Sequence, residues 1–367
     1  MIGPGNAPDS THNDTCARII PATLSDVNSV DIVAIGAGQA GLASAYYLQR
    51  EGADFVVLDR QMAPGGAWQQ VWRSVRLVSP PLYTRLPGLA WDLPFHHPPS
   101  GPEVSGYFAD YEKHYALPIQ RPVRVRSVSG DGRLLVRTDS GDWSARTVIN
   151  ATGTWDHPFV PSVPGMASFL GRQLHTASYD TPEEFAGQHV VVVGGGNSAA
   201  QILAEVSTAA RTTWVTRRPP DLRGGPATEK DLVAVTDQVD ERVRAGLPLR
   251  SVVSYTGIGR TDAVVAAEAR GVMVAHPLFD RITPTGIAWN SGETLAADAI
   301  LWCTGFRPAL SHLAPLHLRG PAGGIVVDDT RVAADPRIFL VGYGPSASLI
   351  SSHRAARHAV TYALSTA

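Results

Sequence analysis

The sequence VAIGAGQAG at residues 33–41 has a counterpart, VVVVGGGNSA, at residues 190–199. Each is a short apolar run that leads into glycines and then into residues typical of a helix. The glycines let the backbone turn tightly and approach a pyrophosphate, which the amides at the start of the helix then face. Two such turns predict an α/β fold with two Rossmann-like, doubly wound dinucleotide-binding units.

The first copy has the features of an FAD site. A helical pattern follows its glycines, Gly52 supplies a stop, and the strand expected at 55–58 ends in Asp59. An acidic residue at this place meets the ribose hydroxyls of an adenine dinucleotide that lacks a 2′-phosphate. The residues predicted to hold FAD here are Gly36, Gly38, Gln39, Ala40, Gly41, Asp59 and Arg60.

The second copy ends differently. The strand expected at 213–216 is followed by Arg217 and Arg218 instead of a carboxylate. Guanidinium groups at a strand end are suited to binding a phosphate, so this copy favours NADPH, with NADH as a second coenzyme that the site could use. The alternative is a solvated charge pair beside two prolines. The residues predicted to bind NADPH are Gly194, Gly196, Asn197, Ser198, Ala199, Arg217 and Arg218.

Composition agrees with a soluble enzyme. The chain has 367 residues, of which 44% are hydrophobic and 17% charged, enough to build the cores of about two or three domains. A net charge of −2 without a large basic cluster argues against a nucleic-acid partner. No apolar run is long enough to span a bilayer, so no membrane association is expected. Residues 1–30 lack the features of a signal peptide and are expected to be a flexible tail on a cytoplasmic protein.

Cysteine and histidine usage excludes two further kinds of chemistry. The chain has two cysteines, Cys16 and Cys303, and no C-x-x-C pair. Electron transfer to such a dithiol, as in thioredoxin-type reductases, is therefore excluded. The histidines lack the spacing of metal ligands, and no metal site is predicted.

One segment between the two units carries a family resemblance. Residues 169–179, FLGRQLHTASY, match the pattern F-x-G-x-x-x-H-x-x-x-Y. The chain, from Asp31 to its end, resembles the flavin-dependent monooxygenases, which use one FAD and one NADPH on two Rossmann-type domains. That group includes amine- and sulfide-oxidising enzymes and Baeyer–Villiger enzymes. Baeyer–Villiger enzymes usually carry Trp-Pro where this chain has Tyr179-Asp180, so the heteroatom-oxidising branch is favoured.

Three shorter segments extend the resemblance. The run at 65–68 is similar to the family's G-G-x-W, the run at 151–153 to its A-T-G, and residues 298–308 look like a strand returning to the FAD domain. The resemblance implies an FAD domain of residues 31–164 and 283–367, interrupted by an NADPH domain of residues 165–282. It adds these cofactor contacts: Gly66, Ala67, Trp68, Ala151, Thr152, Gly153, Thr304 and Gly305.

The resemblance also indicates three candidate catalytic positions. Val78 stands where many members place an asparagine over the flavin, and valine cannot donate a hydrogen bond. His175 and Tyr179 lie in the F-x-G motif, where an interdomain structural role for His175 is favoured over a general base. The segment after Gly344 is shorter than in relatives, so the substrate side of the site is expected to differ.

The activity that the resemblance implies is oxygenation of a small lipophilic molecule. NADPH delivers hydride to the flavin, O2 then gives a C4a-hydroperoxide shielded from water, and a sulfide or amine attacks it. Sulfoxidation is the favoured reaction. The aromatic residues of the segment 72–102 are expected either to line the substrate site or to pack the FAD domain: Trp72, Tyr83, Trp91 and Phe95.

Other functions remain open at this point. Val78 is the reason to consider an NADPH oxidase or flavin reductase that is uncoupled from oxygenation. A Baeyer–Villiger monooxygenase and a non-catalytic NADPH-binding regulator are further alternatives. A homodimer is compatible with each of them.

Overall fold

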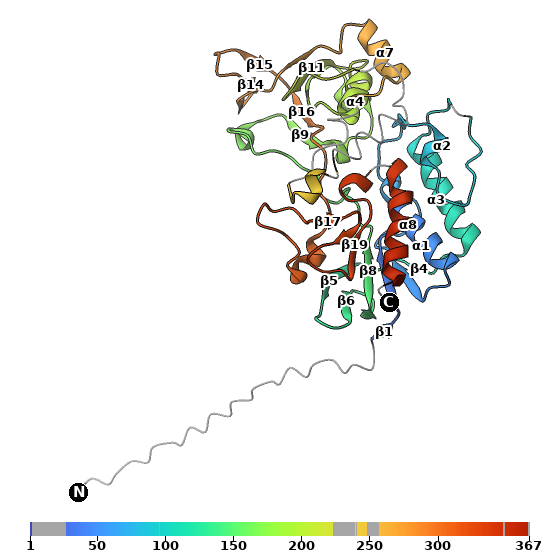
Figure 1. The fold of residues 1–367 in the computed structure, drawn as a ribbon. Helices are drawn as coiled ribbons and strands as arrows, with labels where there is room; N and C mark the ends of the chain where they lie inside the picture. The colour runs from blue at the N-terminus through green and yellow to red at the C-terminus, as the bar shows by residue number, and fades with distance from the viewer. Residues whose placement is uncertain are drawn as a thin grey trace.

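The structure is a computed structural model that describes residues 1, 27–94, 96–222, 239, 241–247, 257–347 and 349–365. The predictions that concern residues 2–26, Cys16 and Phe95 lie outside the described residues. Figure 1 shows two lobes, one with α1, α3 and α8 and the other with α4, α7 and β11. Each lobe is built on its own largely parallel sheet.

A seven-stranded sheet forms the core of the first lobe. In spatial order its strands are β17 (Val327–Asp328), β18 (Arg331–Val332), β19 (Ile338–Leu340), β8 (Thr147–Asn150), β2 (Ile32–Ile35), β3 (Phe55–Leu58) and β4 (Ile119–Gln120). The strands from β19 to β4 run parallel to one another. Because β3 and β8 flank β2 on opposite sides, the first glycine turn lies at the switch point where doubly wound folds bind ligands.

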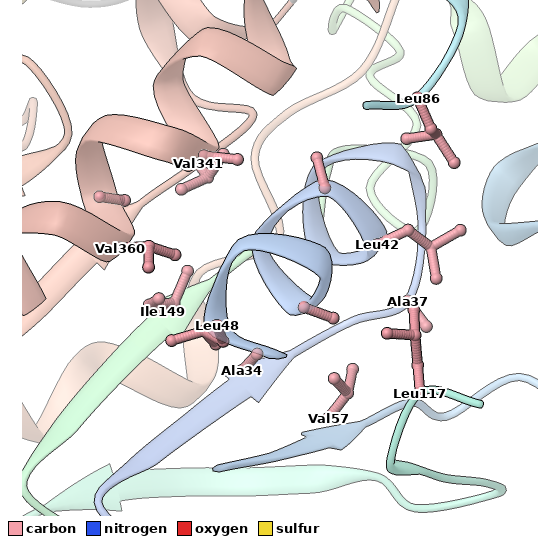
Figure 2. Packing of buried hydrophobic residues seen from close by; sticks show 14 of the residues in the cluster. Ala34, Ala37, Leu42, Leu48, Val57, Leu86, Leu117, Ile149, Val341 and Val360 are labelled. Atoms are coloured by element: carbon pink, nitrogen blue, oxygen red, sulfur yellow. The ribbon is translucent and has the colours of Figure 1, made fainter. Parts of the chain in front are cut away.

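Both faces of this sheet are buried, which explains why its strands are apolar without polar alternation. Helices α1 (Gln39–Arg50), α3 (Gly101–Tyr115) and α8 (Leu349–Ser365) cover one face. Figure 2 shows Leu42 and Leu48 of α1 against Ala34, Val57 and Ile149 of the sheet. Helix α3 begins with a capping box in which Ser100 and Glu103 exchange hydrogen bonds, as its sequence favours.

A second, four-stranded sheet covers the other face. Its order is β1 (Asn28–Ser29), β7 (Trp143–Ala145), β6 (Leu134–Thr138) and β5 (Val125–Ser129). Val128 and Val136 of this sheet pack with Val33 and Ile35 of β2. The predicted flexible tail of residues 1–30 is therefore too long, because Asn28 and Ser29 pair with Trp143–Ser144.

The second lobe contains a five-stranded parallel sheet. Its order is β12 (Ala275–Pro277), β11 (Arg211–Thr216), β10 (His189–Val193), β16 (Ala299–Trp302) and β9 (Arg172–His175). Helices α4 (Asn197–Val206) and α7 (Asp262–Ala269) pack on one face. A three-stranded sheet of β13 (Arg281–Thr283), β14 (Gly286–Ala288) and β15 (Thr294–Ala296) packs on the other.

Strand β16 corrects the predicted domain division. The sequence predicted that residues 283–302 return to the FAD domain, but β16 pairs in parallel with β10 and β9 in the second sheet. Residues 281–296 likewise pack on that sheet and not on the first. The chain returns to the seven-stranded sheet only with β17, at Val327. The sequence of an apolar strand does not determine which strands it pairs with. The family resemblance therefore placed β16 in the wrong sheet.

Two extended segments join the lobes and run side by side. Phe159 N–H donates to the Gly305 carbonyl at 2.9 Å, and Arg307 N–H to the His157 carbonyl at 2.7 Å. The rings of Trp155 and Phe306 stack at 4.8 Å. Short helices also occur elsewhere in the chain: α2 (Pro81–Thr84), η2 (Gly66–Gln69), η3 (Met166–Ser168), η4 (Thr176–Ser178), η5 (Pro182–Phe185), η6 (Ser311–Leu316) and η7 (Gly344–Ser346).

Candidate functional site

One continuous cavity of about 1490 Å³ extends from the first glycine turn to helix α4 of the second lobe. This volume exceeds the range of about 300–1,000 Å³ that is typical of a single small-molecule site. The sequence-predicted residues that line it are Gly36, Gly38, Gln39, Ala40, Asp59, Arg60, Gly66, Ala67, Trp68, Val78, Ala151, Thr152, Gly153 and Asn197. The other predicted residues lie outside the lining: Gly41, Gly194, Gly196, Ser198, Ala199, Arg217, Arg218, Thr304, Gly305, His175 and Tyr179.

The first glycine turn has the geometry that an anion-binding loop needs. Gly36 has a φ of +97°, and a Cβ on it would come within 2.7 Å of the Ala151 carbonyl oxygen. A Cβ on Gly41 would collide with the Gly36 carbonyl, so glycine there allows α1 to pack closely on β2. Gly38 differs, because the space beside its Cα is open for 4 Å. The turn is thus tight where it touches protein and open where it faces the cavity.

Asp59 lies at the end of β3 and is held by Arg121, whose side chain is 12% exposed. The Arg121 guanidinium donates to Asp59 Oδ2 from Nε at 2.9 Å and from Nη2 at 2.8 Å. The same guanidinium donates to both carboxylate oxygens of Glu112, at 2.7 and 3.0 Å. With Oδ2 engaged in this way, Oδ1 is the Asp59 oxygen best suited to accept from a ligand hydroxyl. Arg121 is not among the site residues predicted from the sequence.

A basic wall continues beyond Asp59. Arg60, Arg124 and Arg126 line this part of the cavity, and Arg60 forms an ion pair with Asp156. Burial, followed by the neighbouring Arg124 charge, lowers the pKa of the Arg60 guanidinium. Such a wall would attract the negative charge of a dinucleotide.

His312 is a buried histidine in the lining that sequence analysis set aside. Its Nε2 lies 2.7 Å from Asn150 Oδ1 at the end of β8. Asn150 Nδ2 donates to Thr152 Oγ1 at 3.1 Å, and Thr152 Oγ1 donates to the Ala309 carbonyl at 2.7 Å. This network orients the predicted A-T-G turn. Burial, with a smaller contribution from His157, lowers the pKa of His312 to about 4, so the ring is neutral at pH 7.

The second glycine turn is strained in a way that only glycine allows. Gly194 has a φ of +139°, and a Cβ on it would collide with the Cys303 carbonyl. Gly195 lies beside the end of β11, where a Cβ would come within 3.9 Å of Thr216. Arg217 and Arg218 follow directly and are both exposed. The turn and the residues Arg217 and Arg218 therefore follow neighbouring strands at the same edge of the sheet.

The contacts of His175 and Tyr179 favour positioning roles over catalysis. His175 Nε2 lies 3.0 Å from the Gly305 carbonyl oxygen, and its Nδ1 accepts from the Ala177 amide at 3.1 Å. Burial lowers the pKa of His175, so its neutral form is favoured. The Tyr179 hydroxyl donates to Glu205 Oε2 at 3.0 Å. His175 thus holds the joining segment at Gly305, and Tyr179 holds helix α4 within the second lobe.

Val78 lines the cavity with 37% of its surface exposed. Its side chain faces Gly259, where a Cβ would come within 2.9 Å of it. Of the two alternatives for the aromatic residues of this segment, packing in the FAD domain holds for Trp91, whereas Trp72 fits neither alternative. Trp72 packs in the core of the second lobe, and Trp91 stacks on Tyr107 in the first.

The comparisons with known proteins agree with this geometry. The family model described as pyridine nucleotide-disulphide oxidoreductase matches residues 33–342. The chain belongs to this family. A solved flavin-containing monooxygenase from Stenotrophomonas maltophilia is 44% identical to it, with a TM-score of 0.83 over 92% of this chain and 99% of that one. The uncharacterized oxidoreductase CzcO of Bacillus subtilis is 35% identical over 76% of this chain and 82% of its own length.

A more distant relative extends this group to plants. The flavin-containing monooxygenase FMO GS-OX2 of Arabidopsis thaliana is 26% identical over 77% of this chain and 61% of its own length. The comparisons confirm the predicted fold class, an oxidoreductase of the flavin-containing monooxygenase kind, and FAD and NADPH as its cofactors. The sequence has no C-x-x-C pair that would correspond to the disulphide part of the family's description. Burial raises the pKa of the Cys303 thiol to about 12.

None of the described helices has both the length and the hydropathy to cross a bilayer. Within the same residues, no group of three or more His, Cys, Asp or Glu side chains could hold a metal ion.

Proposed function

We propose that this flavin monooxygenase transfers one oxygen atom from O2 to the sulfur of a small thioether, with amines as the second substrate class. The observation that carries the proposal is that one cavity is lined both by the first glycine turn and by helix α4, which follows the second glycine turn. A flavin and a nicotinamide bound to the two turns would extend into the same space. Cofactors and a substrate that fill such a space can exclude water from a reactive flavin.

The first turn supports the assignment of FAD to this end of the cavity. The open side of Gly38 leaves room for a pyrophosphate at the N-terminus of α1, where helix amides and the helix dipole favour an anion. Asp59 would accept from the ribose hydroxyls, and the arginine wall would add positive charge. FAD, when bound, accepts hydride from NADPH and reacts with O2. The chain's part is to bind, orient and shield it.

The second turn supports NADPH as the visiting coenzyme. Gly194, Gly196 and the start of α4 would receive its pyrophosphate, as in the first turn. Arg217 and Arg218 are exposed beside this turn, directly after β11. They would bind a 2′-phosphate.

The F-x-G motif and the cavity wall both support a thioether as the substrate. Tyr179-Asp180 replaces the Trp-Pro of Baeyer–Villiger enzymes, which favours a soft heteroatom over a ketone. Val71, Leu77, Val78 and Phe108 give the wall apolar surface suited to a lipophilic thioether. The net reaction would convert thioether, O2, NADPH and a proton into sulfoxide, water and NADP⁺.

The test places two substrates side by side. The FAD-loaded enzyme is incubated with NADPH, O2 and either a methyl aryl sulfide or a cyclic ketone, and sulfoxide, lactone and peroxide are measured. We expect sulfoxide to exceed lactone. Lactone without sulfoxide would refute the substrate class.

An NADPH oxidase is the second candidate, and Val78 is the observation that favours it. Valine offers no hydrogen bond in a wall where an oxygenated flavin would gain one. In that case peroxide would equal the NADPH consumed, whichever substrate is present.

A further inference from the structure

Helix α4 carries a row of polar side chains on the face turned to the cavity. Asn197, Gln201 and Glu205 are spaced four residues apart, so they lie on one face of the helix. All three line the cavity. We refer to these three residues as the polar stripe. It begins at the second glycine turn and runs along the cavity wall.

Each end of the polar stripe holds a different part of that wall. Asn197 Oδ1 accepts from the Gly259 amide at 2.9 Å. Glu205 accepts from the Tyr179 hydroxyl at 3.0 Å and from the Trp72 indole at 3.4 Å. These contacts link α4 to segments that are far away in the sequence.

Gln201, in the middle of the polar stripe, pairs with the backbone of Arg76. The Arg76 amide donates to Gln201 Oε1 at 3.1 Å, and Gln201 Nε2 donates to the Arg76 carbonyl at 3.0 Å. The side-chain amide thus pairs with the main chain as a neighbouring strand would. Gln201 is 7% exposed, so water competes little for these two bonds.

The segment that Gln201 holds, residues 72–78, is shared between the two lobes. Trp72 and Val75 belong to the core of the second lobe, whereas Leu77 belongs to the core of the first. The Leu77 amide donates to the Pro99 carbonyl at 2.9 Å, just before α3. Val78 follows directly and lines the cavity. The position of Val78 therefore depends on contacts with both lobes.

We infer that Gln201 is a positioning residue that couples dinucleotide binding at the start of α4 to the placement of the segment 72–78. An anion at the N-terminus of α4 fixes the helix, and Gln201 transmits that restraint to the Arg76 backbone and so to Val78. This inference rests on the proposed binding of NADPH at the second turn. A purely structural Gln201 would affect stability but not the response of the segment to coenzyme.

The experiment measures amide hydrogen exchange of the FAD-loaded protein with and without NADP⁺. In the wild type we expect NADP⁺ to slow exchange at the Arg76 amide and at Ala200, in the first turn of α4. In Gln201→Leu the Arg76 amide should exchange about threefold to tenfold faster, as loss of one net hydrogen bond implies. NADP⁺ should still protect Ala200 in this variant but no longer Arg76.

Two further variants control the interpretation. Gln201→Glu keeps an acceptor for the Arg76 amide but loses the donor, so it should retain part of the response, and it replaces Gln201→Leu if that protein does not fold. Thr208→Ala, exposed beyond the end of α4, should behave as the wild type.

Three results would overturn the inference. They are full protection of Arg76 by NADP⁺ in Gln201→Leu, no protection of Arg76 in the wild type, and no protection of Ala200, which would also refute NADPH at this turn. A wild type that forms only peroxide would refute the proposed oxygenation alone, because the exchange measurement needs no turnover.

Discussion

Gly38 is the residue at which the proposed FAD site can be tested with least disturbance of the fold. Its backbone is extended, with φ −79° and ψ −170°, which any residue adopts, and the space beside its Cα is open. Gly38→Val should therefore fold but place a side chain in the space proposed for the pyrophosphate. We expect the purified variant to be colourless. The control is Gly106→Val on α3, which also points into open space but lies away from the cavity. Equal flavin content in both variants would contradict the assignment.

Arg217 and Arg218 test the choice of coenzyme. Replacing both by alanine should weaken the binding of NADPH by about 1.5–3 kcal/mol, the range for hydrogen bonds to a charged group. The binding of NADH should scarcely change. Steady-state kcat/KM with each coenzyme measures the difference. Arg281→Ala, which removes an exposed guanidinium elsewhere in the second lobe, is the control. An equal loss of kcat/KM for both coenzymes would show that the arginines do not bind the 2′-phosphate.

His312 predicts a pH dependence of stability. Its pKa is lowered from 6.5 to about 4 on folding, so the unfolded chain binds one more proton within that window. Stability should therefore fall as the pH drops from 6.5 to about 4, by about 3 kcal/mol from this residue. His312→Gln should remove that part of the pH dependence in urea unfolding, whereas His114→Gln, on the exposed face of α3, should not. Parallel curves for wild type and His312→Gln would refute the prediction.

At the scale of elements, Arg121 ties β3, β4 and α3 together. It follows β4 and neutralises Asp59 at the end of β3 and Glu112 on α3, with side-chain exposures of 12%, 6% and 11%. Arg121→Met leaves the buried Asp59 carboxylate and the partly buried Glu112 carboxylate without this partner, and loss of the partner of a buried charge costs about 3–5 kcal/mol. Arg172→Met breaks the exposed pair with Glu184 and should cost less than about 1 kcal/mol. Urea unfolding measures the free energy of unfolding of both variants. Similar losses would show that the Arg121–Asp59 pair stabilises the fold no more than an exposed ion pair does.

The elements that sequence predicted well are those whose signals are local. Both strand–turn–helix units formed where the glycines and apolar periodicity placed them, because tight turns and amphipathic helices depend on neighbouring residues. Strand β16 was assigned to the wrong sheet because its apolar run is compatible with either. Strand β16 belongs to the second sheet because it pairs with β10 and β9, and no local sequence pattern predicts these pairings.

The candidate site was predicted in part, for the same reason. The first glycine turn, Asp59 and the A-T-G turn converge on the cavity as expected. Gln201, His312 and Arg121 were missed, because each acquires its role from a partner distant in sequence. A signal for Gln201 was present: a polar residue four positions beyond Asn197 in an otherwise apolar stretch of helix.

At the scale of the whole molecule, one cavity extends from the first lobe to helix α4 of the second. We propose that the inserted unit ends after β16, since the chain then runs back along residues 153–159 to the first lobe. His175 and Thr304 hold these joining segments, at the Gly305 and Phe159 carbonyls. The cavity between the lobes is thereby positioned by main-chain contacts, and its chemistry depends on the cofactors that it would enclose.

The central claim is that this cavity couples NADPH oxidation to transfer of one oxygen atom. The most direct measurement supplies dioxygen labelled with the heavy isotope of oxygen, together with NADPH and a methyl aryl sulfide, and counts labelled sulfoxide per NADPH consumed. We predict one labelled oxygen atom in each sulfoxide and a product-to-NADPH ratio close to one. Unlabelled sulfoxide would contradict the account, and so would the formation of one hydrogen peroxide for each NADPH consumed.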